Sequence, residues 1–214
     1  MINFIDLFAG IGGMRLGLEL ACKKLNIETR CILSSEIDYK ACETYALNFD
    51  EIPQGDIKNI DKISSFNFIL AGFPCQPFSY AGKHQGFGDT RGTLFFEVER
   101  ILDKYKPDGF LLENVRGLVT HDKGRTLKTI INKLNDLDYS VEYLLLNSSN
   151  FNVPQNRVRI YIVGKKGSQP NLTIKSDKGA IDSHSFKKNI IQGDLFAPIN
   201  YPTKPLTVKD ILKI

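Results

Sequence analysis

The chain has 214 residues, of which 42% are hydrophobic and 24% charged, and these values are typical of one soluble globular domain with its own core. Its apolar runs fall short of the roughly 20 residues that a membrane span needs, so we expect no membrane protein. The start, "MINFIDLFAG", has an acid in its apolar part and no basic residue, which is not the pattern of a signal peptide. A net charge of +4 is compatible with a polyanionic partner but does not indicate one.

The four cysteines show neither a C-x-x-C pair nor zinc spacing with the three histidines, so we expect no metal site. Without an export signal, they predict reduced thiols and a cytoplasmic protein. Cys22, Cys31 and Cys42 lie in apolar patterns that are typical of core positions. Cys75 differs, because it stands between a proline and a glutamine where a strand is expected to end.

Short apolar runs alternate with longer amphipathic stretches through most of the chain. The apolar runs predict strands at residues 2–8, 29–36, 66–73, 108–115, 139–147 and 157–165, with a further short strand that ends at Asp56. The amphipathic stretches predict helices at residues 13–26, 39–49, 93–106 and 124–138. This alternation predicts an α/β fold with a doubly wound, mixed and mostly parallel sheet that closes in a C-terminal antiparallel hairpin.

The character of the sequence changes after Gly164. Residues 165–205 are polar, with scattered glycine, proline, asparagine and serine and no sustained period, and "PLTVKDILKI" adds one short amphipathic turn. We therefore expect a domain at residues 1–164 and an irregular extension at residues 165–214.

A glycine-rich turn follows the first predicted strand, in "DLFAGIGGMRLGLE". Gly10, Gly12 and Gly13 allow a sharp turn and bring a ligand close to the start of a helix. Arg15 stands where the dinucleotide fingerprint needs its third glycine, so a nicotinamide or flavin dinucleotide is disfavoured. A nucleoside cofactor remains compatible with the motif, and so does a plain tight turn.

Two acids follow the next two predicted strands, at the sheet edge where ligands collect in such folds. Glu36, in "SSEID", is suited to accept hydrogen bonds from both hydroxyls of a ribose. Asp56, in "QGDI", is suited to an exocyclic amine, with Ile37 and Ile57 on the two faces of the ring. Each acid alone is more often a helix cap or a turn residue, and only together with the glycine turn do the two acids favour one shared site.

A thiol and a carboxyl group are expected at the same edge, since Cys75 follows the fourth strand and Glu113, in "ENV", follows the fifth. This pair indicates addition coupled to proton transfer, and the thiol needs activation because free cysteine is mostly protonated at neutral pH. No histidine has a spacing that suggests pairing, which disfavours a cysteine protease. Arg157 and Arg159 alternate in "QNRVRIY" and therefore point to one face, where they either orient Glu113 and bind anions or form a solvated row.

The segment after Cys75, "QPFSYAGKHQGFGDTRG", is long, rich in glycine and polar, which is typical of a functional loop. Its glycines suit the hinges of a lid. Lys83, His84 and Arg91 are candidates for phosphate contacts.

Five segments in this order, "DLFAGIGGMRLGLE", "GFPCQPFS", "DTRGTLFFE", "ENVRGL" and "VPQNRVRIYIVG", resemble the cytosine-C5 DNA methyltransferases from Asn3 to Gly164. The resemblance implies the Rossmann-like methyltransferase fold, S-adenosylmethionine as cofactor, and double-stranded DNA with a flipped cytosine as substrate. It implies Cys75 as the nucleophile at C6, Glu113 as the group at N3, and Arg159 at the cytosine carbonyl oxygen, with Arg157 in support.

The same resemblance assigns the other contacts. Those of the cofactor match Phe8, Gly10, Ile11, Gly13, Glu36, Ile37, Asp56, Ile57, Gly72, Pro74 and Leu94. Those of the loop that closes over the DNA match Gln76, Ser79, Lys83 and Arg91.

The resemblance fades after Gly164, and the chain carries neither the family's target-recognition region nor its last segment. We therefore expect a second polypeptide, or a longer protein, to supply them, with this chain inactive or nearly so alone. A restriction–modification role follows by analogy. Two alternatives stay open: a non-catalytic relative that binds cofactor or partner, and a transfer RNA cytosine methyltransferase.

Overall fold

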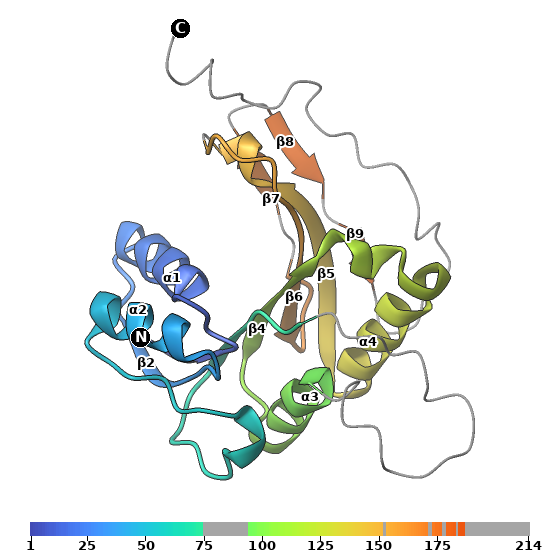
Figure 1. Cartoon of the computed structure of the whole chain (residues 1–214). Coiled ribbons are helices and arrows are strands. Elements are labelled where there is room, and N and C mark those ends of the chain that lie inside the picture. The colour runs from blue at the N-terminus through green and yellow to red at the C-terminus, as the bar shows by residue number, and fades with distance from the viewer. Residues whose placement is uncertain (75–93, 152, 171–172, 177–178, 183, 187–214) are drawn as a thin grey trace, which may run out of the picture. The chain divides into compact units, whose positions relative to one another are not determined.

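The computed structural model describes residues 1–74, 94–151, 153–170, 173–176, 179–182 and 184–186 (Figure 1). The chain forms two compact units, Met1–Leu112 and Glu113–Ile214. Cys75 and the loop residues Gln76, Ser79, Lys83 and Arg91 lie outside the described residues.

The first unit is built on parallel strands in the order β2-β1-β3-β4. These are β1 (Ile2–Leu7), β2 (Thr29–Ser35), β3 (Phe68–Ala71) and β4 (Gly109–Val115), whose last three residues belong to the second unit. The connections carry the helices α1 (Gly13–Lys24), α2 (Tyr39–Phe49) and α3 (Leu94–Tyr105) and the 3-10 turn η1 (Ile57–Asn59). Parallel neighbours need such crossovers, so strand and helix alternate along the chain.

The core of this unit follows from its apolar patterns. In β1, Phe4, Ile5 and Leu7 are fully buried, as expected for a strand that is covered on both faces. Helix α3 buries side chains at helical spacing, which places one apolar stripe against the core; they are Phe95, Val98, Ile101 and Leu102.

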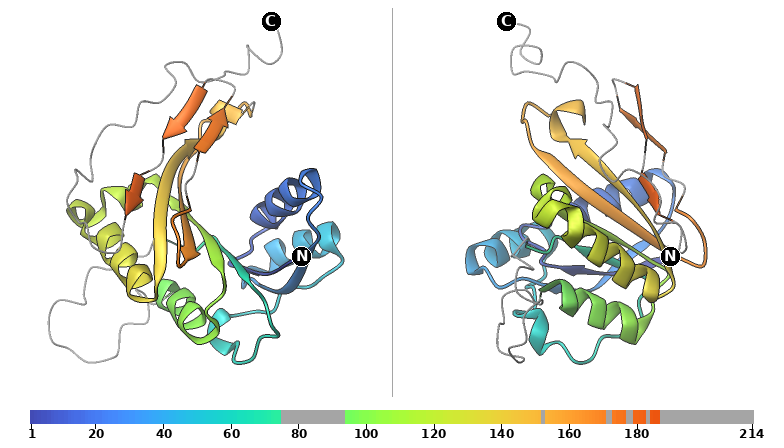
Figure 2. Two further views of the ribbon diagram at one scale, coloured as in Figure 1. Left: turned by 180° about the vertical axis from the view of Figure 1, so that it is seen from behind. Right: turned by 90° about the vertical axis from the view of Figure 1, so that its right-hand side faces the viewer.

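The second unit is built on an antiparallel pair, β5 (Tyr139–Asn147) and β6 (Val158–Lys166), which run side by side in both views of Figure 2. Their register runs from Tyr139 opposite Lys166 to Asn147 opposite Val158. The short strand β9 (His184–Phe186) pairs with β5 as well, while β7 (Thr173–Ser176) and β8 (Gly179–Asp182) form a separate hairpin. The remaining elements are α4 (Arg125–Asp136) and the 3-10 turns η2 (Arg116–Val119), η3 (His121–Gly124) and η4 (Ser148–Phe151).

Parallel pairing in the first unit and antiparallel pairing in the second confirm the predicted mixed sheet and its hairpin. Two expectations need correction. The strand expected before Asp56 is only an isolated bridge between Ser35 and Gln54. The stretch expected to be an irregular extension contains β7, β8 and β9. No helix in the described part of the chain is long and apolar enough to cross a bilayer.

Candidate active site

The carboxyl ends of three strands lie level in the first unit, because Leu7 is paired with both Ser35 and Ala71. Phe8, Glu36 and Gly72 follow these ends directly. The edge is closed by backbone hydrogen bonds, since the N–H of Ala9 donates to Ser35 at 3.0 Å and that of Gly72 to Leu7 at 3.2 Å. The prediction that the glycine turn and Glu36 lie at one edge of the sheet is thus confirmed, whereas Asp56 does not follow a strand.

The turn after β1 depends on left-handed backbone conformations. The φ angles are 54° at Phe8, 54° at Gly10 and 88° at Gly12. A Cβ at Gly12 would lie 2.1 Å from Cε2 of Phe49, so any other residue there would have to displace the Phe49 ring as well as adopt a left-handed backbone. Phe8 is a bulky residue in a conformation that such residues rarely adopt, and strain of this kind is common at functional sites.

The Glu36 carboxylate is held by three backbone donors. Its Oε2 accepts the N–H of Gly10 at 2.8 Å, and its Oε1 accepts those of Ile37 at 2.8 Å and Asp38 at 2.9 Å. A carboxylate offers about four acceptor positions, so one remains for an outside hydroxyl. This geometry leaves room for one of the two ribose hydroxyls predicted for Glu36, not for both.

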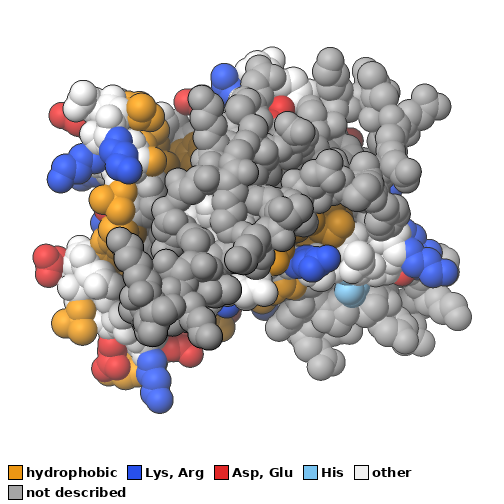
Figure 3. Space-filling view, turned by 90° about the horizontal axis from the view of Figure 1, so that it is seen from above, with side chains coloured by type: hydrophobic (Ala, Val, Ile, Leu, Met, Phe, Trp, Pro, Cys, Tyr) orange, Lys and Arg blue, Asp and Glu red, His pale blue; other side chains and the backbone are white. Residues whose placement is uncertain are grey.

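Apolar side chains beside this edge are exposed: Ile11 to 59% and Ile37 to 75%. Hydrophobic side chains also reach the surface on the face shown in Figure 3. Ile57 does not match its predicted role at the second face of a ring, because it is 2% exposed and belongs to the core. Asp56 caps η1, since its Oδ1 accepts the N–H of Lys58 at 3.0 Å, which is the cap alternative that the sequence left open.

The other predicted cofactor residues lie at the starts of helices or after β3. Gly13 and Leu94 are the first residues of α1 and α3, and Pro74 is exposed two residues after Gly72. Among the described residues, no group of three or more His, Cys, Asp and Glu side chains could hold a metal ion.

A buried polar network joins β1 and α1, the elements on either side of the glycine turn, and was not predicted from the sequence. Asp6 is 1% exposed on β1 and accepts a hydrogen bond from the Tyr45 hydroxyl at 3.3 Å. Arg15 Nη1 donates to the same hydroxyl at 2.9 Å and to Glu51 Oε2 at 2.8 Å. Burial raises the pKa of Asp6 to about 7, against the lowering effects of Tyr45 and Arg15. The sequence feature that pointed to this network was Arg15, which stands where the dinucleotide fingerprint has a glycine.

In the second unit, Glu113 of β4 is paired with Arg159 of β6. Arg159 Nε lies 2.8 Å from Glu113 Oε1, and both side chains are about one-fifth exposed, at 20% and 21%. Burial raises the pKa of the Glu113 carboxyl, although the charges of Arg159 and Arg157 and the hydrogen bond from Arg159 act in the opposite direction. The predicted orientation of Glu113 by an arginine is therefore present.

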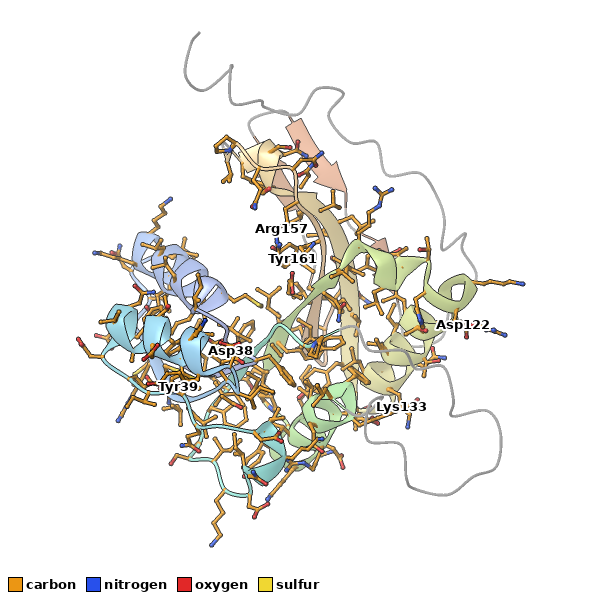
Figure 4. All side chains as sticks on the ribbon, in the orientation of Figure 1. Asp38, Tyr39, Asp122, Lys133, Arg157 and Tyr161 are labelled. Carbon is orange, nitrogen blue, oxygen red and sulfur yellow. The ribbon has the colours of Figure 1, made fainter. Side chains whose placement is uncertain are left out.

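Arg157 immediately precedes β6 and is exposed, whereas Arg159 and Tyr161 alternate on one half-buried face of that strand. Figure 4 labels Arg157 and Tyr161 in this region. Burial raises the pKa of the Tyr161 phenol, and the charge of Glu113 adds to the effect. Tyr161 was not predicted, although its place two residues after Arg159 was a usable signal.

The first unit, with its parallel strands, glycine turn and acid after β2, has the Rossmann-like fold of S-adenosylmethionine-dependent methyltransferases. A solved structure described as a putative DNA modification methyltransferase encoded within a prophage (E. coli) matches with a TM-score of 0.64. It is 24% identical, and the match covers 99% of this chain and 54% of that one. At this identity the likeness shows the fold.

The sequence matches the model of the C-5 cytosine-specific DNA methylases over residues 2–213, and the chain belongs to this family. It is 66% identical over 212 residues to the Type II methyltransferase M.BanI of Aneurinibacillus aneurinilyticus, which covers 99% of this chain and 48% of the relative. It is also 66% identical over 213 residues to M.HgiCI of Herpetosiphon aurantiacus, covering 100% and 50%. The chain thus spans about half the length of the curated relatives it matches. The family uses S-adenosylmethionine, as the resemblance implied.

Proposed function

We propose that this chain carries the catalytic part of a DNA cytosine-C5 methyltransferase of a restriction–modification system, acting in the cytoplasm. The observation that carries the proposal is the half-buried Glu113–Arg159 pair with its 2.8 Å contact. A carboxyl group with a raised pKa, oriented by an arginine, suits the exchange of a proton with a ring nitrogen.

The first unit would bind the cofactor. Glu36 has an acceptor position left for a ribose hydroxyl, the turn at Gly10 allows close approach, and Ile11 and Ile37 offer apolar surface. When bound, S-adenosylmethionine supplies an electrophilic methyl group. We retain as further candidate contacts Phe8, Gly13, Asp56, Gly72, Pro74 and Leu94.

The reaction would proceed on a cytosine flipped out of double-stranded DNA. The Cys75 thiolate forms a bond from Sγ to C6, while Glu113 gives its proton to N3. The C5 carbon, now nucleophilic, would take the methyl group as the sulfur–methyl bond of S-adenosylmethionine breaks, with S-adenosylhomocysteine as the leaving group. Loss of the C5 proton to a base then breaks the bond from Sγ to C6, and N3 returns its proton to Glu113, which restores both residues.

Arg159 would contact the cytosine carbonyl oxygen while it holds Glu113, and Arg157 would support it. Gln76, Ser79, Lys83 and Arg91 would contact the DNA. The curated relatives are about twice as long as this chain, so we propose that the part matching their other half is needed for transfer. That part would be supplied either by a second polypeptide or by a longer polypeptide that includes this chain.

Covalent capture tests the proposal. DNA made with 5-fluorocytosine at every cytosine avoids the need to know the target sequence, because fluorine at C5 blocks the final elimination. The chain is mixed with this DNA, S-adenosylmethionine and the second half of the 66% identical relative M.BanI, expressed separately. We expect an adduct that survives denaturing electrophoresis.

The matched variants are Cys75→Ala and Cys22→Ala, each of which removes one thiol. We expect Cys75→Ala to form no adduct and Cys22→Ala to form as much as the unmodified chain. Equal capture by Cys75→Ala, or none by the unmodified chain in the complemented mixture, would refute the proposal. Preference for fluorinated transfer RNA over DNA would favour the RNA alternative.

A further inference from the structure

Arg157 lies just outside the strand ladder that holds its neighbours. The pairing of β5 with β6 ends where Asn147 faces Val158, one residue after Arg157. Arg157 is exposed, and among the described residues its guanidinium group makes no ion pair. Its position is therefore set through its backbone.

Asn147 and Ser148 together bind both polar groups of the Arg157 backbone. The side-chain Oδ1 of Asn147 accepts the N–H of Arg157 at 3.0 Å, and the N–H of Ser148 donates to the Arg157 carbonyl at 3.1 Å. Oδ1 also accepts the N–H of Ser149 at 3.4 Å, and Nδ2 donates to Asn156 Oδ1 at 2.8 Å. The Asn147 side chain thus continues, for one residue, the hydrogen bonding that the ladder provides to β6.

This arrangement matters for the proposed reaction because Arg157 acts on Glu113 through its charge. The charged groups that act on the Glu113 carboxyl are Arg159 and Arg157, and the charge of Glu113 in turn raises the pKa of the Tyr161 phenol. Arg159 has its own anchor in the ion pair with Glu113. Within the described ranges, Arg157 is held by the backbone contacts just described, so its distance from Glu113 depends on them.

We propose that Asn147 is a positioning residue for the reaction site, which fixes Arg157 relative to Glu113 by bonding the Arg157 backbone. This inference rests on the proposed function for its significance, but its geometry lies within the second unit. The competing interpretation is that Asn147 only closes the β5–β6 loop.

The test follows the titration of the Glu113 side-chain carboxyl carbon by NMR in the full chain, without DNA or cofactor. We compare Asn147→Ala, Arg157→Ala and the double variant. Arg157 lowers the pKa of Glu113, so losing its charge should move the midpoint upward. We expect Asn147→Ala to move it in the same direction, and to add nothing in the Arg157→Ala background, because it acts through Arg157.

Asn147→Asp keeps the acceptor oxygen and separates bonding from folding. We expect amide exchange at Arg157 to accelerate about tenfold in Asn147→Ala, as for one lost hydrogen bond, and to stay within about twofold in Asn147→Asp. Thr129→Ala, on the exposed face of α4, should change neither readout. If Asn147→Ala does not fold, the exchange rate in Asn147→Asp still decides, since loss of protection there contradicts the inference.

An unchanged Glu113 midpoint in Asn147→Ala, beside a shift in Arg157→Ala, would overturn the proposal. Purely additive shifts in the double variant would overturn it as well. Failure of covalent capture with a positive NMR result would instead refute the proposed function alone.

Discussion

Replacing Gly12 by alanine tests how far the turn after β1 depends on glycine. An L-residue at the left-handed φ of 88° costs about 1–2 kcal/mol. The added Cβ would lie 2.1 Å from Phe49 Cε2, where carbon atoms normally stay about 3.5–4.0 Å apart. The Phe49 ring is held 4.7 Å from the Tyr45 ring and 4.3 Å from the Arg15 guanidinium, so it has contacts to lose on moving. Overpacking of this kind adds about 1–3 kcal/mol, so we expect Gly12→Ala to cost about 2–5 kcal/mol.

Substitution of two neighbouring glycines separates the cost of backbone strain from the cost of steric overlap. Gly10 has a φ of 54° and open space around its Cβ position, so Gly10→Ala should cost only the strain, about 1–2 kcal/mol. Gly13 has neither a left-handed φ nor a near contact, so Gly13→Ala should be neutral or stabilise by up to about 1 kcal/mol. Urea unfolding of the three variants measures the free energies. A cost for Gly12→Ala no larger than that for Gly10→Ala would refute the steric reasoning.

Two further predictions concern acids of the first unit. Because the pKa of Asp6 is raised from 3.8 to about 7 in the folded chain, the folded state binds the proton more tightly, and stability should fall by about 3–5 kcal/mol between pH 4 and pH 7. Asp6→Asn should flatten that part of the stability profile in urea unfolding, and an unchanged slope would contradict the assignment. Asp38 caps α2 by accepting the Ala41 N–H at 2.8 Å, so Asp38→Ala should cost about 1 kcal/mol. Asp38→Asn, which keeps an acceptor, should cost less in the same urea-unfolding series, and equal losses would argue against the cap.

Local patterns predicted the elements best where one physical signal dominated. The helix at residues 39–49 has an acid before it and apolar positions at helical spacing, and the strand at residues 139–147 is rich in tyrosine, valine and leucine. Both predicted ranges agree with α2 and β5. Strands β7 to β9 are three or four residues long in polar sequence. These strands form by pairing with other backbone segments. A segment this short shows no hydrophobic periodicity from which a strand could be predicted.

Site residues followed the same rule. Glu36 was predictable because a strand end fixes its place, and its three N–H donors come from the turn and from the next two residues. Ile57 was assigned to a ligand face by its position beside Asp56, but the 3-10 turn that Asp56 caps buries it. The Asp6–Tyr45–Arg15 network joins β1, α2 and α1, and no sequence spacing announces such a three-element contact.

Glu113 shows why recognition of a motif does not by itself account for the chemistry. The arginine that orients this carboxyl also favours its ionised form, at a distance of 2.8 Å, and would on its own make it a poor proton donor. Burial has the larger effect and keeps the pKa of Glu113 raised. A group that gives up a proton and takes it back works best with a pKa near the working pH. Orientation by Arg159 and the proposed proton exchange by Glu113 are therefore compatible, because burial outweighs the effect of the two arginine charges on the pKa of Glu113.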